Sequence, residues 1–298
     1  MPPKSNGSKG GAASRPAVAA SMNLRHWRAV LRNHPRPARL VLARLLERTG
    51  LSPLFTVTLD SYKLRFYPTN LSANLWIDPD SRTDGLALFK DYCKPGDVAI
   101  DVGANIGQVS IILSQRAGRD GRVFAFEPNP RVVRYLEGNL ALNGCANTTV
   151  RNAALGASAG PVRMSDGARD DMNRVDTTGT IEVACSTLDA EIPAGAPIAF
   201  LKIDVEGSEL RVLQGGQATL ARTECVNCEM GEDHHRRYGY GMTDLISFPE
   251  SRGFRTFVAG RSRTLRAVGA DFNEPGGHEL VAIRRPADFL TRTGWTIE

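Results

Sequence analysis

Three carboxylates lie close together in the stretch FLKIDVEGSEL, residues 200–210, which starts as an apolar run broken only by Lys202. The acids are Asp204, Glu206 and Glu209. A buried carboxylate is costly unless a cation or hydrogen-bond donors compensate it. The run is typical of a buried strand, and ligands bind at the carboxyl ends of such strands. We expect Asp204, and with it Glu206, to face a cleft. We expect Glu209 to stabilise the dipole of the helix that follows.

A second candidate site is the loop in VAIDVGANIGQVS, which joins an expected strand to an expected helix. Glycines in such a loop let the backbone turn sharply and approach a ligand closely. The start of the following helix also offers unpaired N–H groups and a positive dipole. The loop therefore predicts a ligand site made by Asp101, Gly103, Asn105 and Gly107.

Glu127 indicates which ligand this loop binds. It ends the next expected strand, 20 residues after Gly107, where an acid can reach the ribose hydroxyls of an adenosine. A dinucleotide requires G-x-G-x-x-G, but Asn105 occupies the second glycine position here and Gly107 comes one residue early. Asp101 at the mouth of the loop would repel phosphate, whereas the ammonium and sulfonium of S-adenosylmethionine favour a nearby carboxylate. The loop favours S-adenosylmethionine, and an NAD-dependent oxidoreductase is the alternative.

Strands and helices alternate along the chain from Asp84 onward, which predicts an α/β fold with a doubly wound, Rossmann-like sheet. The sheet should be mostly parallel, with an antiparallel edge strand, because no clear helix joins the last two strands. Polar turns and a hairpin interrupt the alternation within residues 157–197. The expected strands are residues 97–101, 122–127, 148–156, 198–204, 225–229, 254–260 and 278–285. The expected helices are residues 108–118, 130–144, 208–216 and 243–253.

Composition divides the chain into three parts. Residues 1–22 are rich in Gly, Ser, Pro and Ala and predict a disordered basic tail. Residues 23–83 predict two short basic amphipathic helices, broken at Pro35 and Pro37, and then a hairpin. Residues 84–298 are expected to form the catalytic domain.

The positive charge of the chain is concentrated at its N-terminus. Residues 1–46 hold nine Lys and Arg and no acid, which leaves 28 basic against 32 acidic residues in the remainder. A mildly acidic body argues against a broad nucleic-acid surface. For the basic segment we favour a solvated, partly packed cap. Peripheral membrane contact and an organellar transit peptide are the alternatives.

Cysteine usage and hydropathy bear on localisation. The five cysteines are an odd number in a long chain and do not indicate a disulfide framework. A reducing compartment, the cytoplasm, is the simpler expectation. No apolar run approaches the roughly 18 residues that span a bilayer, and the N-terminus lacks the apolar core of a secretory signal.

Four motifs together carry a family resemblance: DGLALFKDYCKPGDVAIDVGANIGQVS, FAFEPNP, NAALG and LKIDVEGSELRVLQGG. In this order, over residues 84–284, they resemble the FkbM-type methyltransferases. The resemblance implies a class I methyltransferase fold and S-adenosylmethionine as the cofactor. It also implies methylation of a hydroxyl oxygen on a small metabolite, a sugar or a glycan.

The resemblance also implies roles for individual residues. Asn152 and Ala153 fall where the third strand borders the adenine. The cofactor-binding set is then Asp101, Gly103, Asn105, Gly107, Glu127, Asn152, Ala153 and Asp204. Gln108 departs from the family, because members often have an aromatic residue there.

Strand ends indicate the catalytic candidates. Asp204 ends the fourth strand, beside the sulfur end of the cofactor, and is the first candidate for proton acceptor or substrate positioner. Glu229 ends the fifth strand at the same rim. His234 and its neighbour His235 lie in a polar loop, where a histidine is either a base or merely solvated.

We expect no metal site. The spacing of Asp204, Glu229 and a histidine matches no recognised metal motif, although carboxylates at adjacent strand ends could hold Mg²⁺. The Cys225-x-x-Cys228 pair resembles half a zinc site. However, positions i and i+3 of a strand point to opposite faces, so zinc is not expected.

Overall fold

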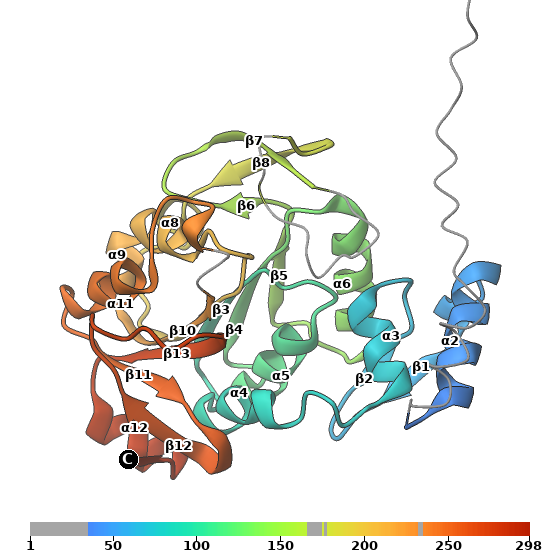
Figure 1. Ribbon diagram of the computed structural model, residues 1–298, viewed down its shortest axis with the longest axis horizontal. Helices are drawn as coiled ribbons and strands as arrows, with labels where there is room; N and C mark the ends of the chain where they lie inside the picture. The colour runs from blue at the N-terminus through green and yellow to red at the C-terminus, as the bar shows by residue number, and fades with distance from the viewer. Residues whose placement is uncertain (1–34, 166–174, 176–177, 232–234) are drawn as a thin grey trace, which may run out of the picture.

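The computed structural model describes residues 35–165, 175, 178–231 and 235–298 (Figure 1). The predicted tail at residues 1–22, the first predicted helix before Pro35 and the candidate His234 lie outside these residues. The predicted three-part division of the chain stays a proposal.

A nine-stranded sheet forms the centre of the molecule, and its parallel part has the predicted doubly wound order. The order across the sheet is β14-β12-β11-β13-β10-β9-β3-β4-β5, and the five strands from β10 to β5 are parallel. The first half of the sheet comprises β3 (Val98–Val102), β4 (Arg122–Phe126), β5 (Thr148–Arg151), β9 (Ile198–Ile203) and β10 (Thr223–Gly231). The rest comprises β11 (Arg255–Ala259), β12 (Thr264–Ala267), β13 (Gly277–Ile283) and β14 (Thr296–Ile297).

The last predicted strand does not lie at the edge. β13 is inserted between β10 and β11 and is antiparallel to both. The sheet then continues through β12, which is antiparallel to β11, to β14, which is parallel to β12. The α/β class is therefore confirmed, and the antiparallel part of the sheet is larger than predicted. Strand order depends on pairing between distant segments, which periodicity does not report.

Alternate side chains of the strands bury on opposite faces, and helices cover both. One face packs against α4 (Ala87–Tyr92), α5 (Gln108–Ala117), α6 (Pro130–Leu142) and α12 (Pro286–Thr293). The other packs against α7 (Leu188–Glu191), α8 (Glu209–Gln214), α9 (Gln217–Leu220) and α11 (Met242–Glu250). Cys225 belongs to the first core and Cys228 to the second, as the alternation predicts. Both thiols are buried.

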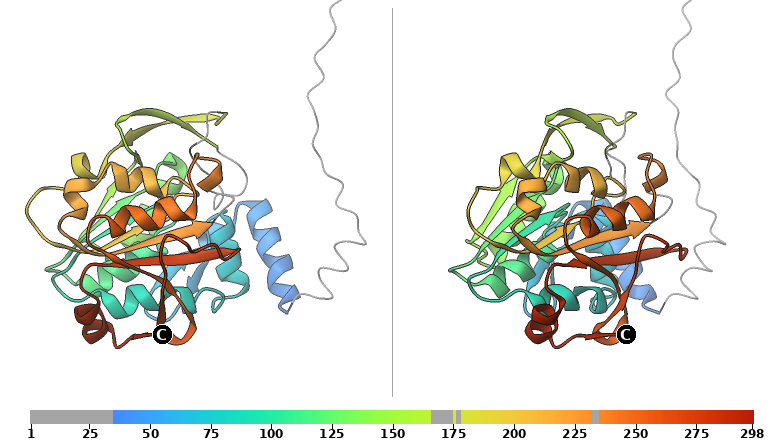
Figure 2. Two further views of the ribbon diagram at one scale, coloured as in Figure 1. Left: turned by 60° about the vertical axis from the view of Figure 1, so that its left-hand side comes forward. Right: turned by 90° about the vertical axis from the view of Figure 1, so that its left-hand side faces the viewer.

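The N-terminal elements pack against the side of this sheet layer (Figures 1 and 2). They are α2 (Pro37–Thr49), η1 (Ser52–Leu54), β1 (Thr56–Thr58), β2 (Lys63–Arg65), α3 (Asn70–Ile77) and η2 (Asp84–Leu86). β1 and β2 form the predicted hairpin. Asn139 of α6 and Asn143, directly after it, accept hydrogen bonds of 2.8 Å from the backbone N–H groups of Arg65 and Lys63, which fixes the hairpin to the sheet domain.

A small second sheet lies over the carboxyl ends of the parallel strands (Figure 1). It contains β6 (Ala154–Leu155), β7 (Gly160–Met164) and β8 (Ile181–Ser186), in the order β6-β8-β7. β7 and β8 are antiparallel and form the hairpin expected in residues 157–197. The remaining element is the short turn η4 (Arg261–Arg263). Among the described residues, no helix is long and apolar enough to cross a membrane.

Candidate active site

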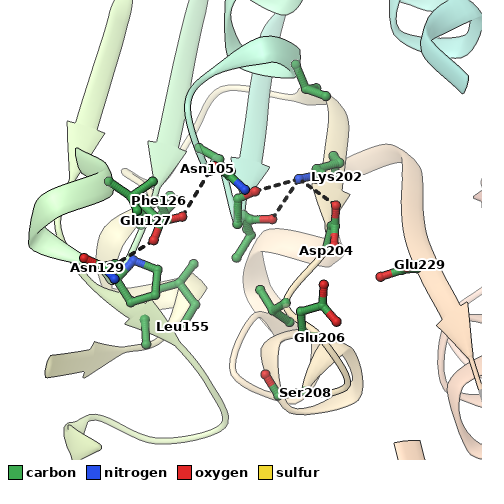
Figure 3. Close-up of a pocket in the computed structure, with 18 of the residues that line it drawn as sticks. Asn105, Phe126, Glu127, Asn129, Leu155, Lys202, Asp204, Glu206, Ser208 and Glu229 are labelled. Carbon is green, nitrogen blue, oxygen red and sulfur yellow. Dashed lines mark hydrogen bonds and ion pairs between the residues drawn. The ribbon is translucent and has the colours of Figure 1, made fainter. Parts of the chain in front are cut away.

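A cavity of about 270 Å³ opens at the carboxyl ends of β3, β4, β9 and β10. This is where a doubly wound sheet binds its ligands. Figure 3 shows Glu127 on one side of it and Asp204, Glu206 and Glu229 on the other. Among the predicted residues, the lining includes Gly103, Asn105, Glu127, Ala153, Asp204 and Glu229.

The loop after β3 follows a path that its glycines permit. Gly103 has φ +77°, and a Cβ atom there would stand 1.8 Å from the backbone oxygen of Asp204. Gly107 has φ +93°, and its Cβ would stand 2.7 Å from Leu136 of α6. The two loops that follow β3 and β9 thus touch through bare backbone, and glycine at position 103 is required for that approach.

Glu127 lines the cavity and is held there by backbone N–H groups, one of them from the loop after β3. Its Oε2 accepts from the backbone N–H of Asn105 at 3.0 Å, and its Oε1 accepts from that of Asn129 at 2.9 Å (Figure 3). Burial raises the pKa of Glu127 to about 7, although the two N–H donors act in the opposite direction. Each carboxylate oxygen has a second lone pair, so the group can accept further hydrogen bonds from a ligand.

Asn105 lines the same cavity and has a buried acceptor without a partner among the described residues. The residue has a left-handed backbone, with φ 48°, which Asn tolerates better than most residues. Its side-chain Oδ1 is buried, and in the described part of the chain it has no hydrogen-bond partner. A buried acceptor without a partner is costly, and a ligand that donates to it would remove this cost.

Asp101 does not line the cavity, contrary to its expected place at the mouth of the loop. Its side chain is completely buried, pairs with Lys202 Nζ at 3.1 Å and accepts from Ser110 Oγ at 2.6 Å. Lys202 also donates to the backbone oxygen of Gly103 at 2.8 Å and lies 3.5 Å from Asp204. Burial acts to lower the pKa of Lys202, but Asp101 and Asp204 together raise it above its usual value. The Lys202 ammonium is the cationic partner of Asp204 in the acidic stretch of residues 200–210. It also contacts the loop after β3 and so connects that loop to the loop after β9.

Of the neighbouring residues Asn152 and Ala153, both predicted to bind the cofactor, only Ala153 lines the cavity. Ala153 is buried and lines the cavity. The Asn152 amide donates to the backbone oxygens of Glu127 and Pro128, at 2.9 and 2.8 Å, and does not line the cavity. Asn152 therefore positions the segment that carries Glu127.

The three acids of the opposite wall converge. One oxygen from each of Asp204, Glu206 and Glu229 lies within 4.8 Å of the other two. Burial, and then the negative charges of Asp204 and Glu206, raise the pKa of Glu229 to about 8. The carboxyl of Glu229 is therefore largely protonated at neutral pH. Three such oxygens could also ligate a divalent cation. Among the described residues this group contains Glu206, and not the histidine considered from the sequence beside Asp204 and Glu229.

Glu209 shapes the loop between Asp204 and α8 instead of only capping the helix. It is buried, and its Oε1 accepts from the N–H groups of Val205 and Gly207 at 3.1 and 3.0 Å. Its Oε2 accepts from the Tyr240 hydroxyl at 3.1 Å and lies 3.4 Å from His235 Nε2. His235 is buried and stacks on the Tyr240 ring. It is therefore part of the support of the acidic loop and is not a solvated loop histidine.

Segments outside the central sheet complete the cavity wall. Leu71 of α3 and Arg82 come from the N-terminal part, and Met164 comes from the small sheet. Gln108, at the position where the family resemblance leads one to expect an aromatic, donates to the Tyr62 hydroxyl at 2.9 Å. The hairpin thus contacts the start of α5, directly after the loop that follows β3. The sequence carries no motif that would have placed Arg82 here, because it lies before the alternating strands and helices begin.

Comparison with known proteins agrees with this geometry. Residues 101–256 match the family model described as the methyltransferase FkbM domain, which covers the loop, Glu127, the acidic stretch and α11. The chain belongs to the FkbM methyltransferase family. This FkbM methyltransferase is 30% identical over 193 residues to the hexuronic acid methyltransferase AglP of Haloferax volcanii, a match that covers 62% of this chain and 77% of AglP. It is 35% identical over 75 residues to the tRNA (guanine(37)-N(1))-methyltransferase Trm5b of Pyrococcus abyssi, which covers 25% of this chain and 22% of that protein.

Among solved structures, the FkbM methyltransferase is similar to a SAM-dependent O-methyltransferase from Thermotoga maritima, with a TM-score of 0.41 and 16% identity. The match covers 70% of this chain and 65% of the other. The family assignment makes the protein an S-adenosylmethionine-dependent methyltransferase and replaces the NAD-dependent alternative.

Proposed function

We propose that the protein binds S-adenosylmethionine in the cavity and transfers its methyl group to a hydroxyl oxygen of a sugar or another small metabolite. The observation that carries the proposal is the pair of opposed walls. On one side is Glu127, held by two backbone N–H groups, and on the other are three carboxylates around Asp204. Glu127 suits the nucleoside part of the cofactor. The three carboxylates suit its sulfonium cation and a neighbouring substrate hydroxyl that loses its proton.

The cavity fits the cofactor in its hydrogen-bonding capacity. Glu127 would accept from the two ribose hydroxyls, and the unpartnered Asn105 Oδ1 offers an acceptor for a further donor. Ala153 and Leu155 supply apolar surface for the adenine on the same side. When bound, S-adenosylmethionine supplies an activated methyl group next to a sulfonium, and the neighbouring carboxylates favour that charge.

Asp204 is the proposed proton acceptor. A hydroxyl oxygen must lie about 3–3.5 Å from the methyl carbon for transfer, and a positioned base contributes about 10²–10⁴-fold. With its pKa raised to about 8, Glu229 is mostly protonated at neutral pH, and we assign the role of base to Asp204. As a neutral acid Glu229 donates a hydrogen bond, so we assign it to holding the acceptor. His234 remains a candidate outside the described residues.

Arg82 favours an acidic sugar as the acceptor. It lines the cavity and is exposed, whereas Lys202, the other cation of the described lining, is already paired with Asp101 and Asp204. Without Arg82 the acidic wall would repel a carboxylate. The name of AglP, a hexuronic acid methyltransferase, agrees with a uronic acid whose carboxylate pairs with Arg82.

Methyl transfer from radiolabelled S-adenosylmethionine to glucuronides and to matched neutral glucosides tests this function. We expect labelled methyl ether on the glucuronide, and an Arg82→Gln variant should raise its KM about tenfold while changing that of a neutral acceptor little. Asp204→Asn should lower kcat about 10²–10⁴-fold, with a smaller loss of cofactor affinity. Absence of cofactor binding by calorimetry would refute the proposal. Label on nitrogen acceptors alone would refute its hydroxyl part.

A further inference from the structure

Exposed apolar side chains gather in one N-terminal segment of the described chain. Seven large hydrophobic side chains of the described residues are exposed, and six of them lie in residues 41–55. They are Val41, Leu42, Leu45, Leu51, Leu54 and Phe55, with Leu54 exposed to 75%. Single exposed hydrophobics are ordinary on a protein surface, whereas a group of this size marks an interaction site.

Helix α2 is apolar on two faces. Leu40, Ala43 and Leu46 are buried against Phe66, Ala73 and Ile77, which attaches the helix to α3. At 100° per residue, Val41, Leu42 and Leu45 fall on the opposite side of the helix, where each is more than 40% exposed. An amphipathic helix on a globular surface normally turns a polar face outward, and α2 does not. In Figure 2 it lies at the outer edge of the molecule.

Arginines flank this outer stripe. Arg39, Arg44 and Arg48 are exposed, and the one acid of α2, Glu47, pairs with Arg44. Residues 1–34 add six further Lys and Arg and no acid. A second copy of this surface, or the chain's own basic N-terminus, would bring like charges together. A partner that fits must offer apolar depth together with negative charge.

We propose that the outer face of α2, made of Val41, Leu42, Leu45 and the flanking arginines, docks on an anionic phospholipid membrane surface. Such a helix lies in the interface plane with its apolar stripe among the acyl chains. Arg44 and Arg48 at its edge contact the headgroups. Arg39 instead donates to the backbone oxygen of Trp76 at 3.2 Å and stays on α3. Nucleic acid would satisfy the arginines but not the leucines. Because α2 packs on α3, and Leu71 of α3 lines the cavity, docking holds the cavity near the bilayer.

Vesicle flotation with the full chain tests this proposal. We expect binding to vesicles of phosphatidylcholine with about one third phosphatidylglycerol, little binding to phosphatidylcholine alone, and loss of binding at 1 M salt, where the Debye length is about 3 Å. Leu42→Gln/Leu45→Gln should lower the partition coefficient about tenfold or more. Arg44→Gln/Arg48→Gln should weaken binding to anionic vesicles alone. Ile297→Gln, at an apolar side chain exposed to 37% on β14, is the matched control and should bind as the wild type does.

Three results would overturn the proposal. One is the absence of wild-type binding to anionic vesicles. Another is equal binding by Leu42→Gln/Leu45→Gln, which would assign the affinity to another part of the chain. The third is a dimer in light scattering that this double variant dissociates, which would make a second copy the occupant. Because both leucines are exposed, the melting temperature of the variant should match that of the wild type, and folding is checked by that measurement.

Discussion

Replacing Glu127 by Gln should weaken cofactor binding while the protein still folds. The carboxylate is buried and already accepts from the N–H groups of Asn105 and Asn129, so each oxygen has one lone pair left for a ribose hydroxyl. Gln keeps the shape but has a single acceptor oxygen, and its NH₂ group faces donors. Loss of one to two hydrogen bonds to a charged acceptor, at about 1.5–3 kcal/mol each, corresponds to about 10- to 10⁴-fold in Kd.

The raised pKa of Glu127 gives this prediction a pH signature. With a pKa of about 7, the wild-type site is half protonated at pH 7, and a protonated acid accepts the ribose hydroxyls less well. Affinity for S-adenosylhomocysteine should therefore fall about tenfold from its plateau by pH 6. Affinity of Glu127→Gln should be nearly independent of pH over the same range.

The same shift has the opposite sign for folding stability. Between about pH 4.5 and 7 the folded protein retains a proton on Glu127 that the unfolded chain has lost. The free energy of unfolding should therefore decrease as pH rises through this window and level off above it. The contribution is on the order of 3 kcal/mol in the wild type and absent in Glu127→Gln.

Isothermal titration calorimetry with S-adenosylhomocysteine at pH 6, 7 and 8 measures the binding part, and urea unfolding measures the stability part. Glu182→Gln, an exposed acid of β8, is the matched control and should change neither quantity. The reasoning would be refuted if Glu127→Gln bound with wild-type affinity, or if its affinity fell with acidification as steeply as that of the wild type.

Three further variants test other parts of the site. If neutral Glu229 holds the methyl acceptor, wild-type kcat/KM should decline above about pH 8. Glu229→Gln keeps a hydrogen-bond donor at every pH and should lose that decline. A decline that persists in the variant would contradict this role of Glu229. Gly103→Ala should destabilise the fold by at least about 3 kcal/mol in thermal unfolding, because the added Cβ meets the backbone oxygen of Asp204. Near-wild-type stability would show that the loops after β3 and β9 do not touch. Tyr240→Phe removes the one hydroxyl hydrogen that the Gly207 oxygen at 2.7 Å and Glu209 Oε2 at 3.1 Å share, so it should cost about 1 kcal/mol and lower kcat while cofactor Kd is unchanged. An altered Kd with unchanged kcat would contradict a role in positioning the acidic loop.

Much of the fold followed from local patterns. The parallel strands were predictable because local periodicity and turn chemistry fix them. The local signals were the apolar runs, the glycines of the first loop and the polar turns after each helix. The position of β13 between β10 and β11 was not predictable in this way. It depends on pairing between strands that are far apart in the sequence. The N-terminal wall of the cavity was missed for the same reason, since contacts between distant segments leave no local pattern.

The acidic stretch shows how far residue types alone can be interpreted. Asp204 was expected at a cleft and lines one, because its place at a strand end fixes its location. Glu209 was expected to serve the helix, and its main contacts are instead with the N–H groups of Val205 and Gly207. Asp101 was expected at the surface of the loop but is buried with Lys202. The partner of Asp101 comes from a distant segment, whereas Glu209 bonds the backbone of its own loop, which residue types alone do not indicate.

A crystal structure of the protein with S-adenosylhomocysteine tests the central claim most directly. The account predicts that the ribose hydroxyls lie on the Glu127 carboxylate and that the sulfur faces Asp204 and Glu229, with room for a sugar hydroxyl between them. A ligand whose ribose lies away from Glu127, or whose sulfur points away from the three carboxylates, would contradict the proposed site.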